Sequence, residues 1–402
     1  MPNGIKEHKA TGPDKIPRKL LKLCVEDLVD SLTFLFQASL DQGTIPDDWK
    51  KAKIVPVFKK GDKGKAENYR PISLTSIICK MLEHIIDSNI RAHLDRHKIL
   101  TDAQHGFRQK KSCETQLITT IRDFAESINN KDQTDAILLD FSKAFDKVDH
   151  KLLLSKLSSY GISNSLLAWL KSFLSNREQT VIVDGSESSP LPVLSGVPQG
   201  TVLGPLLFLV YINDIAKDLS HGTHLRLFAD DSLLYRVIKS PEDSATLQRD
   251  LDSLQRWETI NKMEFHPQKC ELLRITNNKR KIVSQYTIHS VPLSESQSSK
   301  YLGVTIDPKL TWADHQSRII NKANSTLAFL RRNTSACPPK VKNTVYKTFV
   351  RPILEYGSVV WDPHQQTKIS EIEKVQKRAA RFVTGNYEFT HGSTACNLRQ
   401  LD

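Results

Sequence analysis

Apolar side chains repeat at helical spacing over several long stretches of the chain. In residues 75–97 they recur every fourth position and share one face of a predicted helix, at Ile78, Leu82, Ile86, Ile90 and Leu94. Similar patterns predict helices over residues 17–40, 152–160, 201–215, 317–332, 339–350 and 369–383, and after the capping residues Ser112 and Ser240. The chain beyond residue 310 is therefore predicted to be helical.

Shorter apolar runs bounded by turn residues predict strands. They cover residues 54–58, 136–141, 181–183 with a partner near Val193, 225–235 as two strands joined by a turn, 269–275, 282–288 and 301–306. Strands and helices are mixed up to residue 310, and the pattern supports a boundary there.

Length and composition indicate a folded protein of two or three domains. Of the 402 residues, 39% are hydrophobic and 25% charged, which lies within the globular range. No apolar run is long enough to span a membrane, and the first ten residues lack the apolar core of a secretory signal. We therefore expect an intracellular protein. The six cysteines form no CxxC pair, which argues against a zinc site and a disulfide framework.

The net charge of +12 is unevenly distributed. Residues 1–130 carry 22 Lys and Arg against 17 Asp and Glu, and residues 131–310 carry 21 of each. Residues 311–402 carry 14 against 7, a net charge of +7. Basic flanks around a neutral middle are typical of a protein that holds a polyanion, although a solvated basic surface would give the same counts.

Two groups of carboxylates carry the strongest chemical signal. Asp230 and Asp231 stand between two apolar runs, where adjacent like charges repel unless a cation lies between them. Mg²⁺ takes such oxygen ligands. An exposed hairpin tip would also accept the pair. Asp140 ends another apolar run, and a third carboxylate makes a two-metal site possible. We interpret the nearby Asp146 and Asp149 as turn or capping residues.

Six sequence blocks follow one another in an informative order. They are NYRPISL at residues 68–74, QHGFR at 104–108, LLDFSKAFDKVDH at 138–150, SGVPQGTVLGPLLFLVYINDI at 195–215, FADD at 228–231 and YLG at 301–303. Together they closely resemble the reverse transcriptases of non-LTR retrotransposons, of the jockey-like LINE kind, over residues 10–385. The resemblance implies an α+β right-hand polymerase, with fingers, a palm built on a small antiparallel sheet, and a helical thumb.

The resemblance assigns a role to each carboxylate. Asp140 matches one metal ligand, and Asp230 and Asp231 match the acidic pair that completes a site for two Mg²⁺ ions, with Mn²⁺ as an alternative. The backbone near Phe141 would assist. Phe145 matches the ring that lies under the sugar 2′ position and favours dNTPs, with plain packing as the alternative role.

Further positions follow from the same resemblance. Arg70 and the lysines of residues 53–60, Lys53 among them, match positions that meet template and triphosphate. Gln199 lies in the glycine- and proline-rich loop that matches the template–primer contact, and Gly303 matches the primer-grip hairpin. Lys269 matches a lysine that protonates pyrophosphate, although a lone lysine is more often an ordinary surface charge.

These matches imply an RNA-directed DNA polymerase whose partners are an RNA template, a DNA primer and dNTPs. The expected parts are an N-terminal helical extension (1–45), fingers and palm (46–310) and a basic helical thumb (311–402). Family members act on chromosomal DNA, which implies nuclear action. They also carry an endonuclease upstream of the polymerase, so the chain resembles a fragment that lacks it.

Two other functions fit part of the sequence. An inactive, truncated remnant would keep the basic surface and bind nucleic acid without polymerising. An RNA-dependent RNA polymerase would share the carboxylates, but Phe145 and the alanine before Asp230 disfavour it.

Overall fold

The structure is a computed structural model that describes residues 10–387, so the expected N-terminal extension and thumb each have an end (1–9 and 388–402) outside the described residues. The chain begins with two helices, α1 (Arg18–Leu23) and α2 (Val25–Gln42), where one helix over residues 17–40 was predicted. At Cys24 the backbone leaves the helical region, with φ −103° and ψ 26°. The apolar spacing continues across this break and therefore does not reveal it. Gly43 ends α2 in the left-handed conformation, with φ +61° and ψ +31°.

The first sheet combines antiparallel and parallel pairs. Strand β1 is antiparallel to β2 and parallel to β4. The short strands β5 and β6 each pair antiparallel with β4. The strands are β1 (Lys51–Phe58), β2 (Tyr69–Leu74), β4 (Arg177–Val183), β5 (Ser186–Glu187) and β6 (Leu191–Val193). Because Val57 pairs with Arg70, the β1–β2 hairpin carries basic side chains at its outer end.

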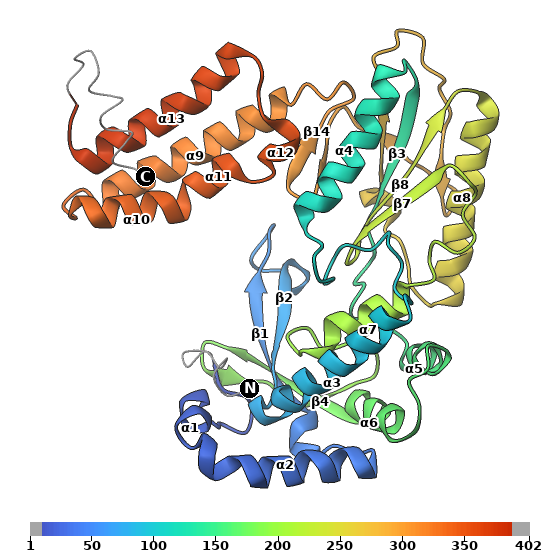
Figure 1. The fold of residues 1–402 in the computed structure, drawn as a ribbon, viewed down its shortest axis with the longest axis vertical. Coiled ribbons are helices and arrows are strands. Elements are labelled where there is room, and N and C mark those ends of the chain that lie inside the picture. Colours follow the sequence, from blue (N-terminus) through green and yellow to red (C-terminus); the bar gives the residue numbers. More distant parts are fainter. Residues whose placement is uncertain (1–9, 388–402) are drawn as a thin grey trace.

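Four helices lie below and to the right of this hairpin in Figure 1. They are α3 (Ile77–Arg96), α5 (His150–Ser159), α6 (Asn164–Leu174) and α7 (Leu203–Ile212). Helix α7 is apolar on all sides, and all its residues except Pro205 are buried, as expected for a helix in the middle of a core. Helix α6 was not predicted. It supplies Trp169, Leu170 and Phe173 to the same core.

The second sheet has the strand order β12-β9-β3-β8-β7. All its pairs are antiparallel except that of β12 with β9. The strands are β3 (Gln133–Leu139), β7 (Thr223–Phe228), β8 (Asp231–Ile238), β9 (Glu271–Ile275) and β12 (Ser294–Glu295). Strand β3 ends at Leu139, and Asp140 lies just beyond this last paired residue.

Helices α4 (Cys113–Asn129) and α8 (Pro241–Ile260) cover opposite faces of this sheet (Figure 1). Alternate residues of a strand point to opposite faces. Ala136 accordingly packs in one core with Leu117 of α4, while Ile137 packs in another with Leu251 of α8.

Beyond β9 the strands are shorter than predicted. Residues 282–288 contribute only β10 (Thr287–Ile288), which pairs with β11 (Val291–Pro292). Residues 301–306, predicted as one strand, instead contain a turn at Leu302 and Gly303, both with positive φ. This turn joins β13 (Ser299–Tyr301) to β14 (Val304–Ile306) in an antiparallel hairpin.

The chain from residue 313 is helical, as predicted, up to Thr384. Its helices are α9 (Ala313–Asn333), α10 (Pro339–Phe349), α11 (Arg351–Glu355), α12 (Ser358–Trp361) and α13 (Gln366–Thr384). Figure 1 shows this bundle beside the second sheet and above the β1–β2 hairpin. Within residues 10–387, no helix has the length and apolar character needed to cross a membrane.

Candidate active site

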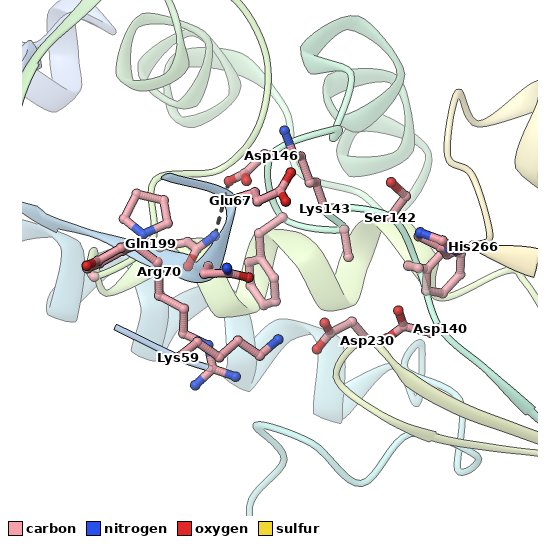
Figure 2. Close-up of a pocket in the computed structure, with 18 of the residues that line it drawn as sticks. Lys59, Glu67, Arg70, Asp140, Ser142, Lys143, Asp146, Gln199, Asp230 and His266 are labelled. Atoms are coloured by element: carbon pink, nitrogen blue, oxygen red, sulfur yellow. Dashed lines mark hydrogen bonds between the residues drawn. The ribbon is translucent and has the colours of Figure 1, made fainter. Parts of the chain in front are cut away.

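A pocket of about 760 Å³ lies between the β1–β2 hairpin and the end of the second sheet (Figure 2). Its walls come from segments far apart in sequence: the hairpin, the segment after β3, the loop before α7, the β7–β8 turn and the chain before β9. The pocket brings together seven of the predicted site residues, which are Arg70, Asp140, Phe141, Phe145, Gln199, Asp230 and Lys269.

The carboxylates meet because of strand pairing. Strand β3 runs antiparallel to β8, and Leu139 pairs with Ser232. Asp140 and Asp231 are the next residues in this register, and Asp230 precedes Asp231 in the β7–β8 turn. Burial raises the pKa of Asp231 to about 6, with a further contribution from the neighbouring charges of Asp230 and Asp140. Burial and Asp140 also raise the pKa of Asp230. The carboxylates therefore repel one another.

Cationic side chains face these carboxylates. Lys59 follows β1 and Arg70 lies on β2, and both reach into the pocket opposite Asp140 and Asp230 (Figure 2). Their positive charges act to lower the pKa of Asp230, although burial outweighs them. Opposite Arg70, Lys269 places its Nζ 3.2 Å from Oδ2 of Asp140. Lys59 and Arg70 thus face the carboxylates across the pocket, while Lys269 pairs with Asp140 on the same side.

The segment before β9 is held against Asp140 by backbone pairing. The His266 N–H donates to the Asp140 carbonyl at 2.8 Å, and Phe141 forms a bridge with Phe265. The Lys269 N–H donates to the His266 carbonyl at 2.9 Å. This chain of contacts brings Lys269 to the carboxylate.

The arrangement and charge of these residues decide whether they suit a metal ion. Within residues 10–387, no group of three or more His, Cys, Asp or Glu side chains is arranged to hold one. Asp140 and Asp230 nevertheless line the same pocket, and their repulsion is the conflict that a divalent cation relieves. Mg²⁺ commonly binds through one or two carboxylates and completes its shell with water and substrate phosphates. The donor set therefore fits Mg²⁺.

Phe145 is held by aromatic contacts. Its ring stacks on Phe208 of α7, with centroids 4.3 Å apart, and meets the edge of Phe107 at 6.4 Å. It also lines the pocket, so the side chain borders both the core and the site. A ring fixed in this way presents a rigid surface to whatever enters.

The loop before α7 is tied to two walls of the pocket. Gln199 Nε2 donates to Oδ1 of Asp146 at 3.1 Å, and the Gln199 carbonyl accepts from the Ser73 N–H at 2.7 Å. Gly200 has φ +108°, and a Cβ there would lie 2.8 Å from the Ser73 carbonyl oxygen. Glycine is therefore required for this close approach.

Three predicted site residues do not line the pocket. Asp231 lies beside Asp230 but outside the lining, Lys53 forms an ion pair with Glu187, and Gly303 lies in the β13–β14 turn. A Cβ at Gly303 would lie 2.8 Å from the ring of Tyr356.

Sequence reasoning missed several residues of the pocket. Asp146 was interpreted as a turn or capping residue, but it lines the pocket and binds Gln199. Asp149 does cap α5, since it accepts from the Leu152 N–H at 3.0 Å. Lys59 belongs to the lysine-rich segment that the sequence singled out, and His266 gave no signal because its place depends on pairing across the sheet.

Comparison with known proteins agrees with this geometry. Residues 57–306 match the family model described as reverse transcriptase (RNA-dependent DNA polymerase). The matched range includes every residue of the pocket lining.

Two curated relatives from mobile elements of fruit flies cover nearly the whole chain. The chain is 30% identical to the probable RNA-directed DNA polymerase from transposon BS of Drosophila melanogaster, over 96% of the chain and 44% of that protein. It is 31% identical to the RNA-directed DNA polymerase from mobile element jockey of Drosophila funebris, over 95% and 43% respectively. The chain thus spans less than half the length of these relatives. The jockey-like resemblance inferred from the motifs is confirmed, and the chain belongs to the reverse transcriptase family.

Proposed function

We propose that the chain is an RNA-directed DNA polymerase that extends a DNA 3′-end on an RNA template with dNTPs. The observation that carries the proposal is the shared pocket. Carboxylates that follow β3 and lie in the β7–β8 turn, cations from the β1–β2 hairpin and the ring of Phe145 all line it. Nucleotidyl transfer needs these elements together, because charge must be balanced around the triphosphate while the sugar is held in place.

Asp140 and Asp230 are the residues that would hold Mg²⁺, with Asp231 in support. The bound ions would activate the primer 3′-hydroxyl and stabilise the leaving pyrophosphate. Lys59 and Arg70 would bind the triphosphate from the opposite wall, because their charges face the carboxylates across the pocket. Mn²⁺ offers the same hard, oxygen-seeking chemistry.

The remaining pocket residues would orient the nucleotide and complete the proton transfer. Phe145 would lie under the sugar and exclude a 2′-hydroxyl, and Gln199 would contact the template–primer. Lys269 lies beside Asp140 with its side chain half exposed, and this position supports its role as the acid that protonates pyrophosphate. Lys53 and Gly303 would contact nucleic acid outside the pocket.

The proposed arrangement is that of a right hand. Residues 46–310 would form fingers, around the β1–β2 hairpin, and a palm, built on the second sheet. Residues 311–402 would form the thumb, and residues 1–45 an N-terminal extension. The mobile-element relatives support action on chromosomal DNA, and hence in the nucleus.

Template and sugar preference test this function. Purified chain is given one DNA primer on an RNA or a DNA template of the same sequence, with dNTPs or rNTPs. We expect extension on the RNA template with dNTPs. Extension with rNTPs alone would instead indicate an RNA polymerase, and binding without any extension would indicate a nucleic-acid-binding remnant.

A further inference from the structure

Ala229 has an unusual backbone conformation directly before the two carboxylates. Its φ is +56°, in the left-handed region that residues other than glycine rarely adopt. Ala229 is also buried, and Asp230 and Asp231 follow it in the β7–β8 turn. The direction in which these carboxylates leave the sheet therefore depends on holding Ala229 in this conformation.

The Gln104 side chain binds both backbone polar groups of Ala229. Its Oε1 accepts from the Ala229 N–H at 2.9 Å, and its Nε2 donates to the Ala229 carbonyl at 3.3 Å. Oε1 also accepts from the Gly106 N–H at 2.7 Å. Only 3% of Gln104 is exposed, so water does not compete for these groups.

The segment around Gln104 is itself fixed to β7. The His105 N–H donates to the Leu227 carbonyl at 2.8 Å, and the Leu227 N–H donates to the Ala103 carbonyl at 2.9 Å. Gly106 approaches so closely that a Cβ there would lie 2.3 Å from the Ala229 nitrogen. Residues 103–106 therefore brace the β7–β8 turn from outside the sheet.

We propose that Gln104 is a positioning residue, which holds Ala229 in the left-handed conformation and thereby aims Asp230 into the active site, with Asp231 beside it. The effect on catalysis rests on the proposed polymerase function, whereas the effect on the turn does not. Gln104 touches neither substrate nor the reacting atoms in this role. It acts through the backbone of the residue that precedes the carboxylates.

The test compares Gln104→Leu with a matched control, Gln133→Leu. Gln133 is also 3% exposed, and its amide likewise binds the N–H and carbonyl of a single residue, Ile282, at 3.0 and 2.8 Å. It lies at the far end of β3 from Asp140. Both variants remove a buried amide of the same kind, so they share the general cost to stability.

Two quantities are measured in each variant: hydrogen exchange of the Ala229 amide, and steady-state kinetics of primer extension. In Gln104→Leu we expect Ala229 exchange to accelerate at least about tenfold and kcat to fall by about 10- to 100-fold, the scale of a small misplacement of catalytic groups. The KM for dNTP should stay within about twofold. Gln133→Leu should change neither Ala229 exchange nor kcat.

A third variant guards against misfolding. Gln104→Glu keeps the acceptor for the Ala229 and Gly106 N–H groups, so Ala229 should stay protected in it. Wild-type exchange at Ala229 in Gln104→Leu, or an equal loss of kcat in the control, would overturn the proposal. A wild-type chain that extends no primer would refute the polymerase function alone, because the exchange measurement would still decide whether Gln104 holds the turn.

Discussion

Phe145 is the side chain through which we propose that packing sets substrate choice. Its ring is fixed between Phe208 and Phe107, and its exposed part faces the pocket. A ring that cannot turn aside excludes a hydroxyl group more strictly than a mobile one, because displacing it would disturb the stacked core.

We therefore expect Phe145→Val to admit rNTPs. Removal of the ring should lower the preference for dNTPs over rNTPs by about tenfold or more, the scale on which single pocket contacts discriminate. Competing incorporation of dNTP and rNTP into one primer measures this ratio. Phe173→Leu, at a buried ring of α6 outside the pocket lining, serves as the control. An unchanged ratio in Phe145→Val would mean that Phe145 is a core residue only.

His315 makes stability depend on pH. It is almost fully buried, its ring lies tilted against the Trp361 ring with centroids 5.1 Å apart, and its Nδ1 accepts from the Thr305 N–H at 3.1 Å, so the ring is held neutral. Burial, aided by the nearby Arg318 guanidinium, lowers its pKa to about 4. The unfolded chain takes up this proton near pH 6.5 and the folded chain only near pH 4, so stability falls as the pH falls through this window.

The contribution of His315 can be isolated by substitution. From pH 7 to pH 5, protonation of His315 in the unfolded chain should lower the free energy of unfolding by roughly 1–2 kcal/mol. His315→Asn keeps an acceptor for the Thr305 N–H but does not titrate, so the decrease in its stability over the same range should be smaller by that amount. Urea unfolding at both pH values gives the difference, and equal decreases in the two proteins would contradict it.

At the level of elements, α7 is the structural centre that connects the pocket to the core. Its first turn is bound by Glu83 of α3, whose Oε2 accepts from the Val202 and Leu203 N–H groups at 2.7 and 3.0 Å. The Glu83 carboxylate is fully buried, and burial raises its pKa. A carboxylate at a helix N-terminus satisfies amide groups that would otherwise have no partner.

Removal of the Glu83 carboxylate should destabilise the chain. Glu83→Ala should lower the unfolding free energy by about 1–3 kcal/mol, because two backbone N–H groups are left without their acceptor. Glu83→Gln should be affected less, since its amide oxygen still accepts and no charge is buried. Urea unfolding of the three proteins compares them. A Glu83→Ala chain as stable as the wild type would show that water replaces the carboxylate.

Element prediction succeeded where one apolar face recurs over several turns. The fourfold spacing predicted a helix over residues 75–97, within two residues of α3 (Ile77–Arg96) at each end, and the cap at Ser112 located α4. It was incomplete where the chain turns without a change in polarity, as at Cys24 and in the β13–β14 hairpin. Helix α6 was missed, although its 11 residues make it as long as α10, which was predicted.

Sequence motifs identified residues of the pocket, but they did not predict how these residues are arranged in space. Asp140 and Asp230 could be singled out because charged residues interrupt or end apolar runs. The partners Lys59, Asp146 and Gln104 could not be assigned, because each lies about 50 residues or more from its contact in sequence. Such pairings arise only once β3, β8 and the β1–β2 hairpin are placed in space.

Across the whole molecule, the C-terminal helices share a core with the second sheet but differ from it in charge. The second sheet and the C-terminal helices share a core, in which Ile319 and Trp361 pack with Ala136 and Tyr235. The C-terminal region nevertheless carries most of the excess positive charge, +7 over residues 311–402. Charge neutralisation is therefore a cleaner probe of this region than truncation, which would open the shared core.

Neutralising basic residues of this region should weaken binding without altering sequence preference. Arg331, Arg332, Lys374 and Lys377 are exposed on α9 and α13. Replacing all four with Gln should flatten the slope of log affinity against log salt by about 0.7–0.9 for each nucleic-acid phosphate that is no longer neutralised. Lys151→Gln together with Lys217→Gln, at exposed positions elsewhere, is the control. A slope unchanged by the four substitutions would exclude these helices from phosphate binding.

The most direct test of catalysis at the carboxylate pair compares the wild-type chain with Asp230→Asn. Primer extension on a heteropolymeric RNA template is followed during a Mg²⁺ titration, and template–primer binding is measured in parallel. Wild-type chain should extend the primer only with Mg²⁺. In Asp230→Asn, extension should fall by a factor of about 10³ or more, because a ligand of the reacting centre is gone, while binding stays within about threefold. Extension that persists in Asp230→Asn, or its absence in a wild-type chain that binds normally, would contradict the assignment of this pocket as a polymerase active site.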